Sequence, residues 1–249
     1  MPRCTAVMSP ILDVTKSSEP HNGDDPLEII CTMAWDKLDD EDILHVANAY
    51  YYFSIQFREN LEIACRLHPN DIRLASLHIG ECDTDNLSPW PKVAAAGEKM
   101  DHDEFMRRLL TLQVSRRGEL IEALGMNYLH RIRALNDGLR ACSIASYEDG
   151  GLSRVFTAML RAPKWHGEAQ QAFKHFLERH IFFDTDDENG HGDLSRHLSI
   201  DDTLIMPFWS AFAELLALAV PGLTQNSTAQ SDGQRDGRLK AEWPLGAAI

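Results

Sequence analysis

The stretch from residue 43 to residue 67 constrains the fold more than any other part of this sequence. It predicts one long helix, with acidic residues 39–42 at its start, where the helix dipole favours negative charge. Apolar side chains occupy nearly all sides of its centre, and a helix without a polar face is buried among other elements. Its aromatic residues are interpreted as core, with a substrate cage as the alternative: Tyr50, Tyr51, Tyr52, Phe53 and Phe57.

Further helices account for most of the remaining chain, because β-branched residues are sparse and never alternate with polar residues over a useful length. Seven or eight helices with short connections predict an all-α fold, a single helical bundle. After residues 43–67, the predicted helices cover residues 71–80, 101–111, 117–147, 151–161, 167–184 and 201–220.

The chain length of 249 residues predicts one domain. Residues 26–224 are assigned to the bundle, because the two ends are rich in small and polar residues with little periodicity. Residues 1–25 are expected to be a poorly ordered lead-in, and residues 225–249 a C-terminal tail.

Composition and charge narrow the classes of function. The chain has 24 basic against 38 acidic residues, a net charge of −14, which argues against nucleic acid and against an anionic membrane surface. Its five cysteines are scattered and form no C-x-x-C pair, as expected of reduced thiols in a cytoplasmic protein. No apolar run marks a signal peptide, and the most apolar window is too short to span a bilayer.

A run of histidines and carboxylates between residues 175 and 197 is the strongest functional signal. It holds four of the eleven histidines. His180 and Asp184 are one helical turn apart, so on a helix their side chains project from the same face. Asp187 and His191 repeat the spacing, although a glycine between them is expected to break the helix. Imidazole with carboxylate suits iron, manganese or zinc, and a solvated acidic turn is the alternative.

Other candidate ligands lie at the ends of predicted helices. A metal site in a bundle is built from side chains of several facing helices. Glu81 follows the helix at 71–80, His102 opens the next one, and Glu148 follows the helix at 117–147. The alternative for Glu81 and Glu148 is a surface carboxylate, and for His102 it is an exposed histidine at a helix start.

The order of these candidate ligands along the chain resembles that of the haem-oxygenase-like diiron oxidases, relatives of the TenA and PqqC helical proteins. That family shows a glutamate ending an early helix, a histidine opening the next, a second glutamate, and a last helix with a His-x-x-x-Asp…His run. The resemblance covers about residues 42–220. It implies six metal ligands: Glu81, His102, Glu148, His180, Asp184 and His191.

Two features depart from the family pattern. The gap between Glu81 and His102 is longer than usual, so residues 83–100 are interpreted as an insertion. The closing histidine usually follows the aspartate by three or four residues, and here Asp187 occupies that place. Either His191 is displaced or Asp187 ligates instead.

The resemblance implies a haem-oxygenase-like bundle that holds Fe(II), two ions per chain or one, and activates O₂ with electrons from an external reductant or redox partner. The carboxylates Glu81, Glu148 and Asp184 would then take part directly in catalysis. Related proteins oxygenate amine nitrogens, or cleave or desaturate amino-acid-like and fatty-acid-like substrates in specialised metabolism. Arg58 and Arg73 are considered as anchors for a substrate carboxylate, with surface or capping roles as the alternative.

Other functions remain open beside the oxidase. One is a metal-independent enzyme of the PqqC or TenA type, with a pocket histidine or cysteine as acid, base or nucleophile. Another is a helical binding protein without catalysis. Related bundles are often dimers, so a homodimer is compatible with each of these interpretations.

Overall fold

The computed structural model describes residues 25–184, 195–199 and 202–227. Within these ranges the chain forms helices and loops, with isolated bridges between Thr84 and Met100 and between Trp90 and Ala94 but no strand. The predicted all-α helical bundle is therefore confirmed. The helices are α1 (Pro26–Thr32), α2 (Asp40–Leu67), α3 (Ile72–Cys82), α4 (His102–Leu109), α5 (Gly118–Arg133), α6 (Asp137–Ser146), α7 (Leu152–Met159), α8 (Glu168–Asp184) and α10 (Asp202–Ala219).

Short helical turns connect some of these helices. A kinked turn, η3 (Tyr147–Gly151), joins α6 to α7. Turns of 3-10 helix are η1 (Trp35–Lys37), η2 (Leu110–Leu112), η4 (Arg196–Leu198) and η5 (Pro221–Ser227). None of the described helices is long and apolar enough to cross a membrane.

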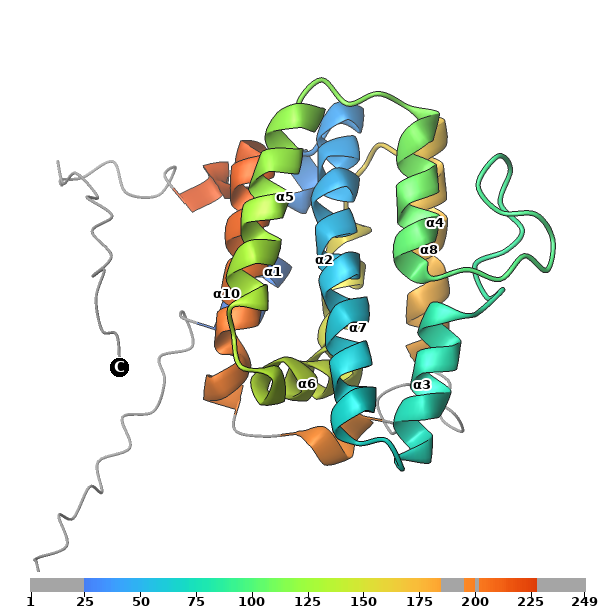
Figure 1. Ribbon diagram of the computed structural model, residues 1–249. Coiled ribbons are helices and arrows are strands. Elements are labelled where there is room, and N and C mark those ends of the chain that lie inside the picture. Colours follow the sequence, from blue (N-terminus) through green and yellow to red (C-terminus); the bar gives the residue numbers. More distant parts are fainter. Residues whose placement is uncertain (1–24, 185–194, 200–201, 228–249) are drawn as a thin grey trace, which may run out of the picture.

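Helix α2 stands at the centre of the bundle, as its apolar surface predicts (Figure 1). It begins with a capping box, in which Asp39 accepts from the Asp42 backbone N–H at 2.9 Å and Asp42 accepts from that of Asp39 at 3.3 Å. Helices α3, α4, α5, α6, α8 and α10 all contact it. The three helices that carry candidate ligands, α3, α4 and α8, therefore pack around one central helix.

The sequence predicted a single helix over residues 117–147, and this was wrong. α5 ends at Arg133 and α6 begins at Asp137. Asn136 caps the new helix, since its side chain accepts from the Gly138 N–H at 2.8 Å. The turn lets α6 lie across the lower end of α5 instead of extending it (Figure 1).

The two ends of the bundle were less completely predicted. α1 was not predicted, although Pro26 at its first turn and Asp25, which accepts from the Leu27 N–H at 3.0 Å, are standard start signals. Apart from Asp25 and residues 225–227, the lead-in and the tail lie outside the described residues.

Gly125 of α5 lies directly against the ring of Tyr52 of α2. A Cβ atom there would lie 2.1 Å from the Tyr52 ring. We expect Gly125→Ala to lower the free energy of unfolding by about 1–2 kcal/mol, because overpacking outweighs the better helix propensity of alanine. Gly118→Ala in the same helix is the control, since its Cβ would meet only Ser115, at 3.9 Å. Urea unfolding measures both variants, and equal stability would contradict this packing.

Candidate metal centre

Glu81 lies on the buried face of α3. The buried residues of this helix are Leu74, Leu77 and Glu81, at the spacing of one helical stripe. The stripe is apolar for two turns and then ends in a carboxylate. Helix packing therefore carries this acidic side chain into the interior, where it is only 5% exposed.

The two histidines also lie on the buried faces of their helices. On α8, buried Phe173 and Phe176 are followed at the same spacing by His180. On α4, His102 is the first helical residue and lies above Phe105 on the buried side. Both imidazoles are 6% exposed. An ionisable side chain on an apolar stripe is thus the sequence signal that these ligands share.

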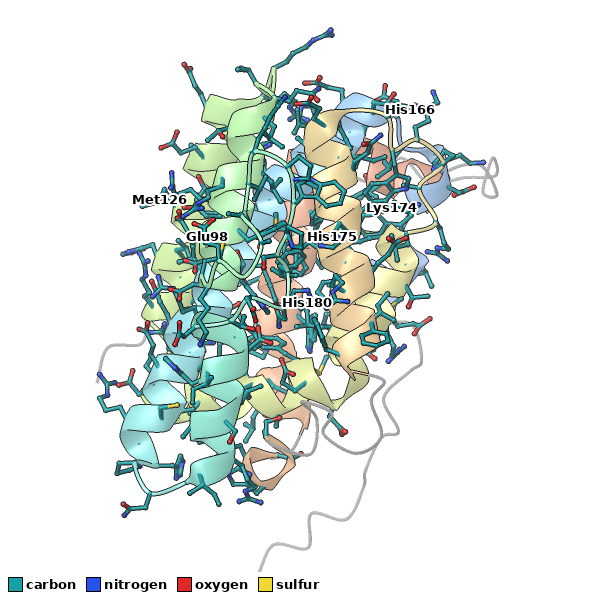
Figure 2. All side chains as sticks on the ribbon, turned by 90° about the vertical axis from the view of Figure 1, so that its right-hand side faces the viewer. Glu98, Met126, His166, Lys174, His175 and His180 are labelled. Carbon is teal, nitrogen blue, oxygen red and sulfur yellow. The ribbon has the colours of Figure 1, made fainter. Side chains whose placement is uncertain are left out.

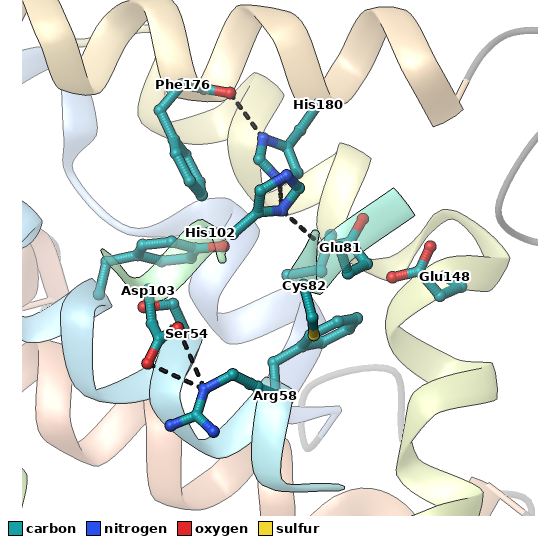
Figure 3. Close-up of a pocket in the computed structure, with 12 residues that line it drawn as sticks. Ser54, Arg58, Glu81, Cys82, His102, Asp103, Glu148, Phe176 and His180 are labelled. Atoms are coloured by element: carbon teal, nitrogen blue, oxygen red, sulfur yellow. Dashed lines mark hydrogen bonds and ion pairs between the residues drawn. The ribbon is translucent and has the colours of Figure 1, made fainter. Parts of the chain in front are cut away.

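The three side chains converge and form the triad Glu81–His102–His180 (Figure 3). Glu81 Oε2 lies 2.6 Å from His102 Nδ1, and His180 Nε2 lies 2.9 Å from the same nitrogen. One ligand atom of each residue lies within 4.8 Å of the other two. Two nitrogens that each bind one ion at about 2.1 Å lie at most about 4.2 Å apart, so these contacts are short enough for a shared ion.

The outward nitrogens of both imidazoles are fixed by oxygen acceptors. His180 Nδ1 donates to the Phe176 carbonyl at 2.7 Å, and His102 Nε2 donates to Asn86 Oδ1 at 3.1 Å. In a neutral ring this leaves a lone pair on each inward nitrogen. These two lone pairs and the Glu81 carboxylate would repel one another at such short distances, so a proton or a metal ion must lie between them. Histidines that bind metals have this arrangement, so the donor set fits a transition metal.

The triad lies in a pocket whose apolar walls are formed by Tyr50, Phe57, Leu152 and Phe176. The space open to the centre of a water molecule is about 20 Å³. This is little more than one water needs. The pocket as it stands therefore holds little more than one water-sized group.

Glu148 belongs to the same pocket and comes from η3. Gly150 has a φ of 82° in this turn, which interrupts the regular helix between α6 and α7. The Glu148 side chain is 6% exposed, and Figure 3 shows it beside Glu81, away from the two histidines.

Four of the six predicted ligands therefore line one pocket: Glu81, His102, Glu148 and His180. Their burial excludes the alternative of exposed helix-end residues for Glu81, His102 and Glu148. Asp184 is the last residue of α8, one turn after His180, and its side chain is outside what the structure describes. His191 and the alternative Asp187 lie outside the described residues.

Arg58 and Arg73, the two candidate anchors for a substrate carboxylate, both pair with carboxylates of the protein. Arg58 lines the pocket, but its Nε lies 3.1 Å from both carboxylate oxygens of Asp103 and its Nη1 lies 2.7 Å from Glu62. Arg73 donates to Asp71, the N-cap residue of α3. The alternative of structural roles therefore fits both side chains better than anchoring a substrate carboxylate.

Cys82 is the thiol in the pocket. Burial, and then the charge of Glu81, raises the pKa of Cys82 well above its usual range. The thiolate is the reactive form of cysteine, so this residue is not prepared to act as a nucleophile.

Sequence reasoning missed Asn86, which holds the outward nitrogen of His102. The residues next to an asparagine in a loop do not reveal which helix its side chain will contact. It also missed that Tyr50 and Phe57 face the pocket, while Phe53, in the same helix, lies in the core away from it. The core interpretation therefore holds for Tyr50, Phe53 and Phe57, and the substrate cage stays a prediction.

No family model, curated protein or solved structure matches this chain. The resemblance to the haem-oxygenase-like diiron oxidases therefore stays a prediction, based on the order of the candidate ligands. What the structure adds is the buried Glu81–His102–His180 triad, a group that can bind a metal ion.

Proposed function

We propose that this protein is an O₂-dependent non-haem iron oxidase or oxygenase. The observation that carries the proposal is the triad, in which two imidazoles with fixed outward nitrogens face a carboxylate inside a buried pocket. Two histidines and one carboxylate with open positions are the ligand set of non-haem Fe(II) oxygenases. Iron bound there would supply the electrons and the coordination positions that O₂ activation requires.

Glu148 favours a centre with two ions. Its carboxylate lines the same pocket as Glu81 but on the side away from the histidines (Figure 3). Carboxylates from facing helices hold both ions in known diiron bundles. In this proposal Asp184, together with His191 or Asp187, completes the ligand set, and an external reductant supplies electrons for each turnover.

The remaining pocket residues would orient and protect the reacting groups. The rings of Tyr50, Phe57 and Phe176 keep bulk water away from the triad. The ion pair between Arg58 and Asp103 fixes two polar side chains at the pocket wall. The proposed substrate is a small amine, or an amino-acid-like or fatty-acid-like molecule, that enters when the pocket opens.

The two alternatives have less support. A metal-independent enzyme would need a prepared acid, base or nucleophile, and the raised pKa of Cys82 disfavours a thiolate. A binding protein without catalysis gives no reason for two imidazoles and two carboxylates to be buried in one pocket, since burying such groups is costly and a bound ion would offset the cost.

Anaerobic loading with Fe(II), followed by mixing with O₂, tests the proposed function. We expect at least one iron per chain, uptake of O₂, and a change in near-visible absorption as the iron is oxidised. Protein loaded with Zn(II) is the control and should take up no O₂. Iron well below one per chain would refute the metal centre, and bound iron that does not react with O₂ in the presence of reductant and candidate amines or acids would refute the oxidase.

A further inference from the structure

Asn86 contacts all three helices that carry the triad. Its side-chain nitrogen donates to the carbonyl of Gly80, the residue before Glu81, at 3.2 Å. Its side-chain oxygen accepts from His102 Nε2 at 3.1 Å. Its backbone carbonyl accepts from Nε of Arg179, the residue before His180, at 3.0 Å. One loop residue therefore joins the ligand-bearing parts of α3, α4 and α8.

These contacts fix which way the Asn86 amide faces. The Gly80 carbonyl can only accept, so the amide nitrogen must face it and the amide oxygen must face His102. An oxygen at that position requires the hydrogen of a neutral His102 ring on Nε2. The lone pair then lies on Nδ1, the nitrogen that is 2.6 Å from Glu81 Oε2.

The loop that carries Asn86 is itself held against α8. The ring of Trp90 stacks on His175 with centroids 4.7 Å apart, and His175 Nε2 lies 3.0 Å from the Leu87 carbonyl, to which it donates. At its two ends the loop closes through backbone hydrogen bonds of 3.4 and 3.0 Å between Thr84 and Met100. Asn86 is therefore presented by an anchored segment and not by a free loop.

We propose that Asn86 is a positioning residue that selects the metal-binding tautomer of His102 and thereby raises the metal affinity of the triad. This inference rests on the proposed metal centre. It also gives a role to residues 83–100, the segment interpreted from the sequence as an insertion. This loop supplies the hydrogen-bond acceptor for His102 Nε2, and it links the helices that carry Glu81, His102 and His180. Removing such a supporting acceptor typically lowers metal affinity about 10–100-fold.

The test compares three variants of the full-length protein by competition titration with Co(II). Asn86→Leu removes both side-chain contacts at nearly constant size, and we expect Co(II) affinity about 10–100-fold lower than in the wild type. Asn86→Asp keeps an acceptor for His102 but loses the donor to Gly80, and we expect it to restore the affinity. Asn48→Leu is the matched control, because the side chain of Asn48 donates to the Leu44 carbonyl within α2, at 2.8 Å, and does not line the pocket.

A spectroscopic measurement separates positioning from general loosening. In the Zn(II)-loaded wild type we expect a slowly exchanging ring N–H signal from Nε2 of His102, which Asn86→Leu loses and Asn86→Asp retains. If Asn86→Leu does not fold, as judged by circular dichroism, Asn86→Ser replaces it, since the shorter side chain cannot reach His102.

The outcomes distinguish this inference from the proposed function. If the wild type binds Co(II) and Asn86→Leu binds it equally well, the role of Asn86 is refuted and the metal centre stands. If Asn86→Asp binds as weakly as Asn86→Leu, the residue is only structural and the inference is also refuted. If the wild type binds no metal, the proposed metal centre fails and the inference fails with it.

Discussion

Replacing His180 with alanine is expected to abolish stoichiometric iron binding while the helical fold is retained. His180 supplies one of the two inward nitrogens of the triad, 2.9 Å from His102 Nδ1. Without it, one imidazole and the Glu81 carboxylate remain in the cluster. The affinity should fall by more than the roughly 10–100-fold expected for loss of a supporting hydrogen bond, because a direct ligand is removed. Iron content per chain and a competition titration measure the effect.

His166→Ala is the matched control for this experiment. Its ring is exposed and pairs with Asp40, and Figure 2 shows it well away from His180. It should keep the full iron content. Unchanged iron in His180→Ala would exclude the triad as the metal centre. A parallel loss of iron in both variants would show that the bound iron is not specific to the pocket.

Replacing Phe53 with alanine is expected to lower the free energy of unfolding by about 3–5 kcal/mol, because a fully buried aromatic ring is removed from the core. Phe53 has no exposed surface. Its ring centroid lies 4.5 Å from that of Phe212, 5.1 Å from that of Tyr147 and 5.5 Å from that of Tyr50. No small rearrangement can fill a space bounded by three such rings.

Tyr51→Ala is the control, because Tyr51 lies near Phe53 in α2 but is half-buried, with a ring contact to Tyr52 at 5.3 Å. We expect it to lose much less stability than Phe53→Ala. Chemical unfolding followed by circular dichroism compares the two. Equal losses would mean that the aromatic run of α2 contributes evenly on all its sides, contrary to the packing described above.

Local signals explain which helices were predicted correctly. The start and end of α2 follow from acidic residues 39–42 and from Pro69, whose effects reach only a turn or so along the chain. The break before α6 lies at Asn136, Asp137 and Gly138, without a proline nearby. Asparagine and glycine weaken a helix without necessarily ending it, so this local signal did not show that Asn136 is an N-cap rather than an interior residue.

The sequence by itself determined that this chain is helical, and it supplied the side chains able to bind a metal. Helical periodicity, caps and apolar stripes depend on residues a few positions apart, so they can be recognised without coordinates. Only the tertiary structure decided that Glu81, His102 and His180 meet, and that Asn86 stands behind one of them. These residues belong to three helices and a loop, and bringing their atoms within a few ångströms depends on how the whole bundle packs around α2.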